Sequence, residues 1–421
     1  MWNSFDNERV GLIMKIALPG KYFGWGGGAE FLRNVAIGLL TKQKERDLSL
    51  YLLLPMHRLD IIRVVKRSVI STVKTRRPTV VLSKPDFYHS FLDCFENLEG
   101  VVEIVYYDNS DRDLLRCLKK RGIDIVLPVF GSLGSDYPIP WIGYLADFQH
   151  KYYPDNFTAE ECAKRDRQFA SFLHDSKSLI VNSRAAKNDI ARFYPDVPVK
   201  IFSLPFSPVP VSAWFDDYEC PVTAKYGLPD SYFLISNQFW IHKDHMTAFK
   251  SLLIATDAHL VCTGLMEDHN HPDHIESLKS FLRDTNLGGR VWLLGHIPKR
   301  DQIEIMKNAR AVVQPTLFEG GPGGGCVYDA ACLGVPVILS DIAVNREVDA
   351  DNLFFFEAGN SGDLARKMMD LLSMNVPRNS REALLSRARM QAERLGDALM
   401  DAVDETLKTY AGESKNLPDN R

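Results

Sequence analysis

Residues 315–330, PTLFEGGPGGGCVYDA, contain five glycines between two carboxylates, Glu319 and Asp329, that lie ten positions apart. Apolar runs at 311–313 and 335–339 enclose this stretch. The order predicts a strand, a glycine loop, a short helix and a second strand. Amides of a glycine loop can turn toward an anion, and the helix dipole adds positive potential. We expect a ligand with phosphate in its middle and hydroxyls at its ends, such as a nucleotide-sugar; a flexible surface loop is the alternative.

The composition is that of a globular protein with more than one domain. The chain has 421 residues, of which 45% are apolar and 25% charged, and its net charge is −4. This balance argues against a nucleic-acid-binding surface, which would be basic. No apolar run reaches the roughly 18–20 residues that span a bilayer, and the N-terminus lacks the features of a signal peptide. Seven cysteines without a CxxC pair favour a reducing cytoplasm.

The N-terminal region begins with a similar pattern. Residues 12–18 predict a strand, a glycine cluster follows at 24–30, and apolar residues at helical spacing occupy 31–40. Strand, glycine loop and helix form the start of a Rossmann-like unit. The glycines do not follow the GxGxxG spacing of a dinucleotide site, so glycines that serve a tight turn alone are the alternative.

Apolar runs and amphipathic stretches alternate along most of the chain, which predicts an α/β fold with parallel sheets covered on both faces. The proline-rich stretch 205–213 interrupts this alternation and is interpreted as a linker. We therefore predict two Rossmann-like domains that face one another across a cleft. The expected organisation is a first domain at 1–204, a second at 214–378, a helix at 379–411 that crosses back to the first domain, and a disordered tail at 412–421.

Residues 58–77 carry seven Lys or Arg residues against one acid, Asp60, with aliphatic residues between them. A basic amphipathic segment of this kind can lie on an anionic membrane surface. An ordinary solvated helix face with an apolar core side explains the pattern equally well, and both interpretations stay open.

Four segments, taken together and in this order, resemble the retaining glycosyltransferases of the GT-B fold, in particular family four. They are 26–30 (GGGAE), 236–245 (SNQFWIHKDH), 294–297 (LGHI) and 315–341. The likeness extends over about residues 12–375. It implies that a nucleotide-sugar lies on the second domain and that the acceptor enters from the first.

The resemblance implies roles for the residues of the glycine loop. Glu319 would contact the transferred sugar and Asp329 the ribose hydroxyls. These acids are ten positions apart in this chain and eight apart in the family, and the second acid is Asp where the family has Glu. Backbone groups of the remaining loop residues would contact the sugar and the phosphates; these are Gly321, Gly323, Gly324 and Gly325, with Gly27 and Gly28 from the first domain.

Three further residues complete the predicted site. Lys243 would neutralise the diphosphate, since departure of a dianionic leaving group requires cations and amides. Gln238 stands where the family commonly has an arginine and would donate a hydrogen bond. His150, in the segment DFQH after the strand predicted at 141–145, would contact the sugar from across the cleft; a structural histidine is the alternative.

The predicted activity is transfer of a sugar from a UDP- or GDP-sugar to a carbohydrate or lipid-linked acceptor, with retention of anomeric configuration, in cell-surface polysaccharide or glycolipid synthesis. We expect no metal, because His269, His271 and His274 follow no zinc-ligand spacing, and no cofactor, because the nucleotide-sugar is a substrate. The expected location is the cytoplasm, on the inner face of the membrane if 58–77 binds lipid. A sugar-nucleotide epimerase of the same fold and a non-catalytic partner subunit are the alternatives.

Overall fold

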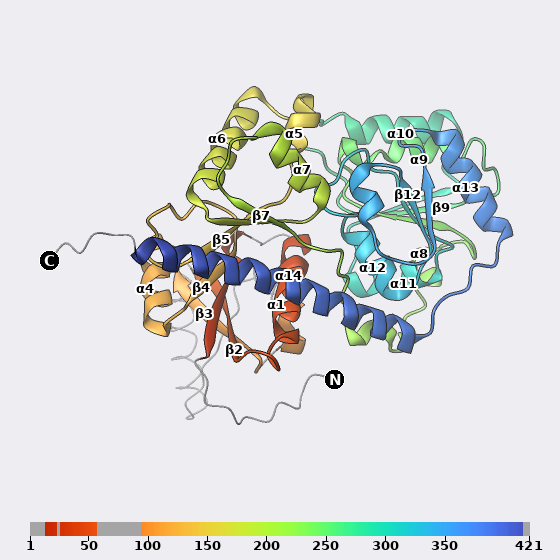
Figure 1. Ribbon diagram of the computed structural model, residues 1–421. Coiled ribbons are helices and arrows are strands. Elements are labelled where there is room, and N and C mark those ends of the chain that lie inside the picture. The colour runs from red at the N-terminus through yellow and green to blue at the C-terminus, as the bar shows by residue number, and fades with distance from the viewer. Residues whose placement is uncertain (1–12, 23–25, 57–93, 99, 416–421) are drawn as a thin grey trace, which may run out of the picture.

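Two α/β lobes lie side by side in the computed structural model, and one long helix runs along both of them (Figure 1). The structure describes residues 13–22, 26–56, 94–98 and 100–415. The basic segment 58–77, one interpretation of which is a membrane contact, lies outside these residues. The two parallel sheets and their covering helices confirm the predicted α/β fold with two Rossmann-like domains.

The first lobe is built on a seven-stranded parallel sheet with the order β3-β2-β1-β4-β5-β6-β7. Its central strands are almost wholly buried, which explains why they read as continuous apolar runs. The strands are β1 Met14–Pro19, β2 Leu48–Met56, β3 Val102–Asp108, β4 Ile125–Val129, β5 Trp141–Leu145, β6 Ser178–Val181 and β7 Lys200–Ser203.

Helices cover this sheet, and local capping defines several of their ends. Thr158 and Glu161 form a reciprocal capping box at the start of α6, and Gly122 ends α4 in the left-handed conformation. The helices are α1 Gly26–Thr41, α4 Asp111–Arg121, α5 Gln149–Tyr152, α6 Ala159–Asp175 and α7 Arg184–Phe193, with short 3-10 turns at η1 Gly20–Tyr22, η2 Glu96–Leu98 and η3 Pro154–Asn156.

The second lobe repeats this architecture with a six-stranded parallel sheet of order β10-β9-β8-β11-β12-β13. Its strands are β8 Phe233–Ser236, β9 Leu260–Thr263, β10 Val291–Gly295, β11 Val312–Gln314, β12 Val337–Ser340 and β13 Leu353–Phe356. Its helices are α8 Val222–Tyr226, α9 His245–Ser251, α10 His274–Asp284, α11 Lys299–Asn308, α12 Gly325–Leu333 and α13 Ser361–Ser373, with 3-10 turns η4 Ser212–Phe215, η5 Ile241–Lys243 and η6 Ala343–Glu347.

The long helix α14 Arg381–Lys415 begins on the second lobe and packs against α1 of the first (Figure 1). The two helices approach closely at glycines. A Cβ added at Gly396 would lie 2.4 Å from the carbonyl oxygen of Gly38. Arg46 of the first lobe reinforces the contact through a two-bond pair with Asp404, at 2.6 and 2.7 Å. The helix continues to Lys415, whereas the disordered tail is expected at 412–421; residues 416–421 lie outside the described residues.

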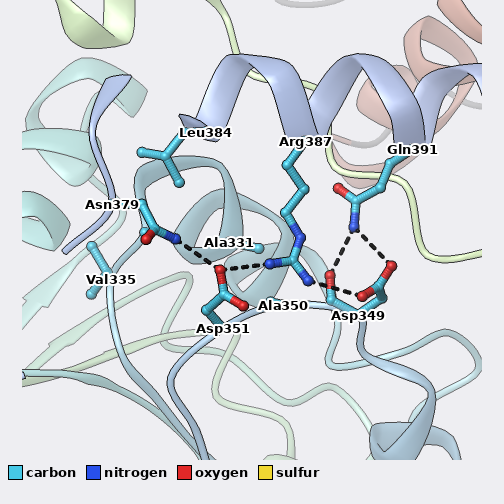
Figure 2. Close-up of a pocket in the computed structure, with 10 residues that line it drawn as sticks. Ala331, Val335, Asp349, Ala350, Asp351, Asn379, Leu384, Arg387 and Gln391 are labelled. Atoms are coloured by element: carbon cyan, nitrogen blue, oxygen red, sulfur yellow. Dashed lines mark hydrogen bonds and ion pairs between the residues drawn. The ribbon is translucent and has the colours of Figure 1, made fainter. Parts of the chain in front are cut away.

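The first turns of α14 are held to the second lobe by charged and polar contacts (Figure 2). The guanidinium of Arg387 lies 2.9 Å from Asp349 and 2.6 Å from Asp351. Gln391 donates to the backbone carbonyl of Asp349 at 2.7 Å. One helix is thus attached to both lobes and constrains how they sit against each other.

Candidate functional site

The candidate site lies at the carboxyl ends of the parallel strands of the second sheet, where ligands bind in open α/β folds. Three loops meet there. They follow β8, β10 and β11, and the last is the glycine loop, which leads into α12. Loops of the first lobe contact this glycine loop, so both domains contribute to the site.

The glycine loop needs glycine at two positions where the backbone is left-handed. Gly323 has φ 70° and Gly324 has φ 68°. A Cβ on Gly323 would lie 2.6 Å from that of Val327, so a side chain there would also clash. The amide of Gly323 donates to the Asn345 side chain at 3.0 Å. Within the described chain, α12 starts at Gly325 without a side-chain cap, which leaves first-turn amides for an anion.

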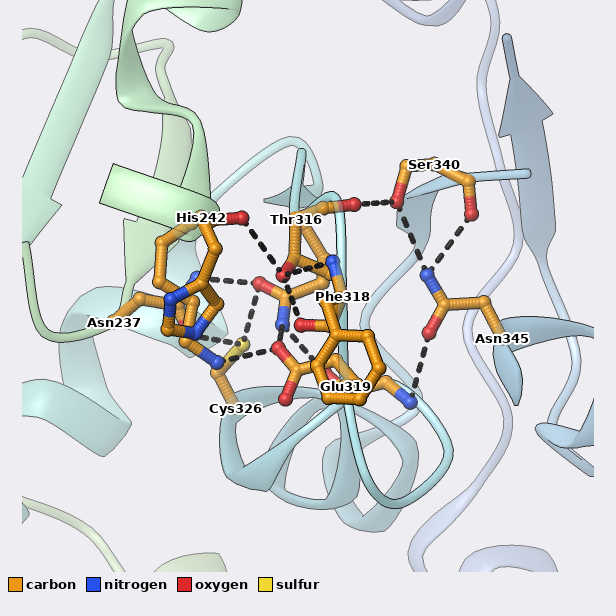
Figure 3. A network of polar contacts seen from close by, with 11 residues as sticks. Asn237, His242, Thr316, Phe318, Glu319, Cys326, Ser340 and Asn345 are labelled. Carbon is orange, nitrogen blue, oxygen red and sulfur yellow. Dashed lines mark hydrogen bonds and ion pairs between the residues drawn. The ribbon is translucent and has the colours of Figure 1, made fainter. Parts of the chain in front are cut away.

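The first carboxylate of the loop, Glu319, forms an ion pair with Lys243 (Figure 3 shows the network around it). Their Oε1 and Nζ atoms are 2.5 Å apart, and both side chains are 11% exposed. Gln314, which is wholly buried, donates to Glu319 at 2.9 Å and to the carbonyl of Gly323 at 2.7 Å. The amide of Gln314 therefore ties the carboxylate to the glycine loop.

Lys243 is positioned by the loop after β8, which is joined to the glycine loop through backbone groups. The carbonyl of His242 accepts from the amide of Leu317 at 2.8 Å and from the Thr316 hydroxyl at 3.2 Å. Burial lowers the pKa of His242 to about 3, and the neighbouring Lys243 ammonium adds to the effect. The imidazole is consequently neutral near pH 7, and Lys243 is the cation at this point of the site.

The second carboxylate, Asp329, lies in α12 and pairs with Lys299 at the start of α11. Its Oδ2 is 2.6 Å from the Lys299 ammonium, which also lies 2.9 Å from Oε1 of Glu30 in the first lobe. The exposed fractions of the side chains are 5% for Asp329, 39% for Lys299 and 36% for Glu30. Burial raises the pKa of Asp329 to about 6; Lys299 opposes the rise and Glu30 adds to it. We call these three residues the Lys299 triad.

The two lobes are in direct contact at the glycine loop. A Cβ at Gly320 would lie 2.2 Å from the carbonyl oxygen of Ala146, so only glycine permits this approach. Ser183 donates to the carbonyl of Gly320 at 3.0 Å while its oxygen also caps α7. Glu347 of the second lobe accepts from the amides of Arg184 and Ala185, each at 2.8 Å. A side chain of one domain thus caps a helix of the other.

The His150 side chain is buried in the packing of the first lobe. It is 3% exposed, its Nε2 is 3.0 Å from Asp166, and its ring packs edge-on against Phe157 and Phe169. Burial lowers its pKa, although Asp166 opposes the shift. These contacts are those of the structural histidine, and its catalytic role remains a prediction.

The other predicted donor residues occupy loop ends that border the site. Gln238 is exposed directly after β8, and Gly325 is exposed at the start of α12. Gly321 packs beside Asn182 of the first lobe; a Cβ added at Gly321 would lie 3.2 Å from the Cβ of Asn182. In the first turn of α1, Gly27 is exposed and Gly28 is buried. The structure therefore places Gly321 at the contact between the lobes, while the contacts of all these residues with a ligand stay predictions.

Metal ligation and membrane crossing find no support in the part of the chain that the structure describes. No cluster of three or more His, Cys, Asp or Glu side chains there is arranged to hold a metal ion. Nor does any helix among those residues have the length and apolar character to cross a bilayer.

Sequence reasoning missed the polar partners of the two carboxylates. Gln314 is a buried polar residue at the end of an apolar strand, just before the glycine loop, and that position was the available signal. Lys299 follows β10 much as Lys243 follows β8, so both are cations after strands of one sheet. Neither pattern predicts which carboxylate each residue contacts, because the carboxylates belong to other elements.

Comparison with known proteins adds a family match and a set of similar folds. Residues 231–391 match the family model described as glycosyl transferases group 1. No curated protein matches the chain at a significant level.

Several solved structures resemble the whole chain at low sequence identity. HepE from Anabaena, in complex with UDP and glucose, is 14% identical over 96% of this chain and 100% of that chain, with a TM-score of 0.55. Sucrose-phosphate synthase from Thermosynechococcus elongatus is 13% identical over 96% and 98%, with a TM-score of 0.54. A glycosyltransferase from Rickettsia africae ESF-5 is 13% identical over 97% and 100%, with a TM-score of 0.53. The chain has the two-domain Rossmann-like fold of these proteins, and its second domain matches the glycosyl transferases group 1 family.

Proposed function

We propose that this protein is a retaining glycosyltransferase that moves a sugar from a UDP- or GDP-sugar to a hydroxyl group of a carbohydrate or lipid-linked acceptor. The observation that carries the proposal is the Lys243–Glu319 pair, held 2.5 Å apart beside a glycine loop that the other domain contacts. The family match of the second domain supports it. Similarly folded HepE was solved with UDP and with UDP-glucose, which favours a nucleotide-sugar donor.

In the proposed reaction, the bond between the anomeric carbon and the diphosphate oxygen breaks, and the electron pair stays on the diphosphate. We assign the stabilisation of that charge to Lys243 and the first-turn amides of α12, which starts without a side-chain cap. Diphosphate binding would draw the Lys243 ammonium away from Glu319. The freed carboxylate of Glu319 could then accept hydrogen bonds from the sugar hydroxyls.

Retention follows if the acceptor oxygen bonds to the anomeric carbon on the face that the leaving group vacates. The proton of the acceptor hydroxyl then passes to the departing phosphate oxygen, so the step needs no protein nucleophile. The contact of Gly320 with the first lobe would exclude water and so favour transfer over hydrolysis.

A donor screen tests the proposal. The protein is incubated with UDP- and GDP-sugars and candidate acceptors, and products are identified by mass spectrometry and their anomeric configuration by NMR. UDP or GDP should raise the melting temperature, and NAD should not. Stabilisation by NAD alone, or an inverted product, would contradict the proposal.

We further propose cytoplasmic synthesis of a cell-surface polysaccharide or glycolipid, with residues 58–77 on the anionic face of the membrane. The seven basic residues of that segment support the location. The protein should sediment with vesicles that contain anionic lipid at low salt and be released at high salt. Absence of binding at low salt would refute the membrane contact and leave the transfer proposal untouched.

A further inference from the structure

The arrangement of the Lys299 triad differs from the direct ribose contact that the family resemblance implies for Asp329. In the family pattern, the second acid of the loop meets the ribose directly. Here the Asp329 side chain is 5% exposed, whereas Lys299 and Glu30 are 39% and 36% exposed. A ligand that enters between the lobes would therefore meet Lys299 and Glu30 first, with Asp329 behind them.

The hydrogen-bonding capacity of the triad points the same way. A lysine ammonium has three N–H donors and no acceptor. Asp329 at 2.6 Å and Glu30 at 2.9 Å engage two of the Lys299 donors. Among the described residues these are its two carboxylate partners, and the ammonium also lies 5.4 Å from the centroid of the Trp214 ring. A hydroxyl oxygen of a ligand can replace this weaker contact and accept from the third N–H. Glu30 in turn keeps a carboxylate oxygen that can accept from a hydroxyl.

The place of the triad relative to the glycine loop suits the sugar end of a nucleotide. Asp329 is four residues beyond Gly325, so it lies about 6 Å along the axis of α12 from the start of that helix. The diphosphate is expected at the start of the helix, next to Lys243. The nucleoside of the same ligand can then extend along α12 toward Lys299.

We propose that Lys299 and Glu30 bind the vicinal hydroxyls of the donor ribose, and that Asp329 is the buried counter-ion that positions Lys299. The inference rests on the proposed function, since it assumes a nucleoside diphosphate on the glycine loop. Lys299 donates to the 2′-hydroxyl oxygen, and Glu30 accepts from the 3′-hydroxyl. Because Glu30 belongs to the first lobe, the ribose is held only when the two lobes are in contact.

The test is the preference for ribose over deoxyribose. Isothermal titration of the full chain with UDP, 2′-deoxy-UDP, GDP and 2′-deoxy-GDP gives this preference for each base. The wild type should bind the ribonucleotide about tenfold more tightly, as expected for a hydrogen bond to a charged group. Lys299→Met should weaken ribonucleotide binding about tenfold, change deoxyribonucleotide binding less than twofold and so abolish the preference.

Two further variants distinguish a loss of ribose binding from a loss of folding. Lys299→Gln keeps a neutral donor and should retain part of the preference; it replaces the Met variant if that variant does not fold. Lys307→Met changes a lysine of the same helix α11 that pairs with Glu304 at 2.8 Å, and it should behave as wild type. Melting temperatures establish that each variant is folded.

The outcomes separate the two proposals. If the wild type binds a ribonucleotide and Lys299→Met keeps the preference for ribose, the inference is wrong and the proposed function stands. If the wild type binds ribo- and deoxyribonucleotides equally tightly, the inference is also wrong, and the proposed function stands. If no nucleotide binds the wild type, the proposed function fails, and the inference fails with it.

Discussion

The two lysine–carboxylate pairs at the glycine loop differ in how many domains they need. Lys243 and Glu319 both belong to the second domain, and neutral Gln314 completes their contacts. Lys299 and Asp329 also belong to that domain, but their third partner, Glu30, comes from the first. The first pair is therefore assembled by the fold of one domain, and the complete triad exists only while the lobes touch.

This difference implies that different residues carry out the transfer reaction and hold the two domains together. Substitutions at the Lys243–Glu319 pair should abolish transfer without changing the domain contact. Substitutions at the domain contact should disturb the triad and leave the first pair intact. The predictions below test that separation.

The largest effect is expected for Lys243→Met, which removes the cation proposed for the diphosphate. Loss of one preorganised charge of this kind costs about a thousandfold in rate, or about 4 kcal/mol. Transfer is measured with the donor identified in the screen. Glu319→Gln should also reduce transfer, because a neutral amide accepts weaker hydrogen bonds from the sugar hydroxyls than the carboxylate does.

The matched control for Lys243→Met is Lys250→Met, which changes an exposed lysine in α9. Its rate should stay within twofold of wild type. If Lys243→Met retains transfer within threefold while folded, the assignment of Lys243 to the diphosphate is wrong.

The second largest effect is expected for Gly320→Ala, which introduces a steric clash at the contact between the two lobes. The added Cβ would lie 2.2 Å from the carbonyl oxygen of Ala146 and 2.7 Å from the Cβ of Asp147, so the lobes must separate. A displacement of about 1 Å at a reacting site costs on the order of a hundredfold in rate. Gly288→Ala, at an exposed glycine with open space around it, is the control.

Gly320→Ala should also lower the ribose preference, since Glu30 would move away from Lys299. Its binding of inorganic pyrophosphate should change less than threefold, because the Lys243–Glu319 pair stays within one domain. Equal losses for both ligands would show that the two pairs are not independent.

A smaller effect is expected for Glu347→Gln, which weakens the cap that the second domain places on α7. Glu347 accepts from the amides of Arg184 and Ala185, and loss of a helix cap costs about 0.5–2 kcal/mol. If that energy favours closure, kcat/KM should fall roughly two- to thirtyfold, with the melting temperature of the variant reduced only slightly. A variant with wild-type kinetics would show that closure does not depend on this cap.

The smallest effect on transfer is expected from a change at His245, which acts on the pH dependence of stability beside the first pair. His245 is fully buried against Phe239, and burial lowers its pKa to about 3, with His274 and Lys243 adding to the effect. Between pH 6.5 and 3 the unfolded chain therefore binds a proton at this position that the folded chain does not bind, so acid destabilises the fold.

His245→Phe removes this proton, and the variant should gain stability relative to wild type as the pH falls. The gain should approach about 1.4 kcal/mol per pH unit below pH 6. Urea unfolding at pH 7.5, 6.0 and 5.0 measures it, with His269→Gln, on an exposed loop, as the control. Parallel pH profiles for His245→Phe and wild type would contradict the prediction.

Most elements of the fold were predictable because they depend on short-range pattern. The strand expected at 141–145 is β5 Trp141–Leu145, and the helix expected after the glycine loop is α12. Runs of buried apolar residues and left-handed glycines leave a local signature, which can be read without a structure.

The environment of individual side chains was less predictable. His150 follows β5 as expected, yet its ring lies among Phe157, Phe169 and Asp166. Whether a side chain after a strand points to a cleft or into the packing depends on the short helix that carries it, α5, and on the helix that covers it, α6.

The sequence by itself determined two Rossmann-like domains, a glycine loop at a strand end and a lysine and a carboxylate for the first pair. These follow from periodicity, from glycine's access to positive φ and from the order of the segments. Only the tertiary structure decided that Lys299 stands between Asp329 and Glu30, and that Gly320 contacts Ala146. Such contacts join residues from different elements and domains, and their distances are set by packing between the lobes rather than by local sequence.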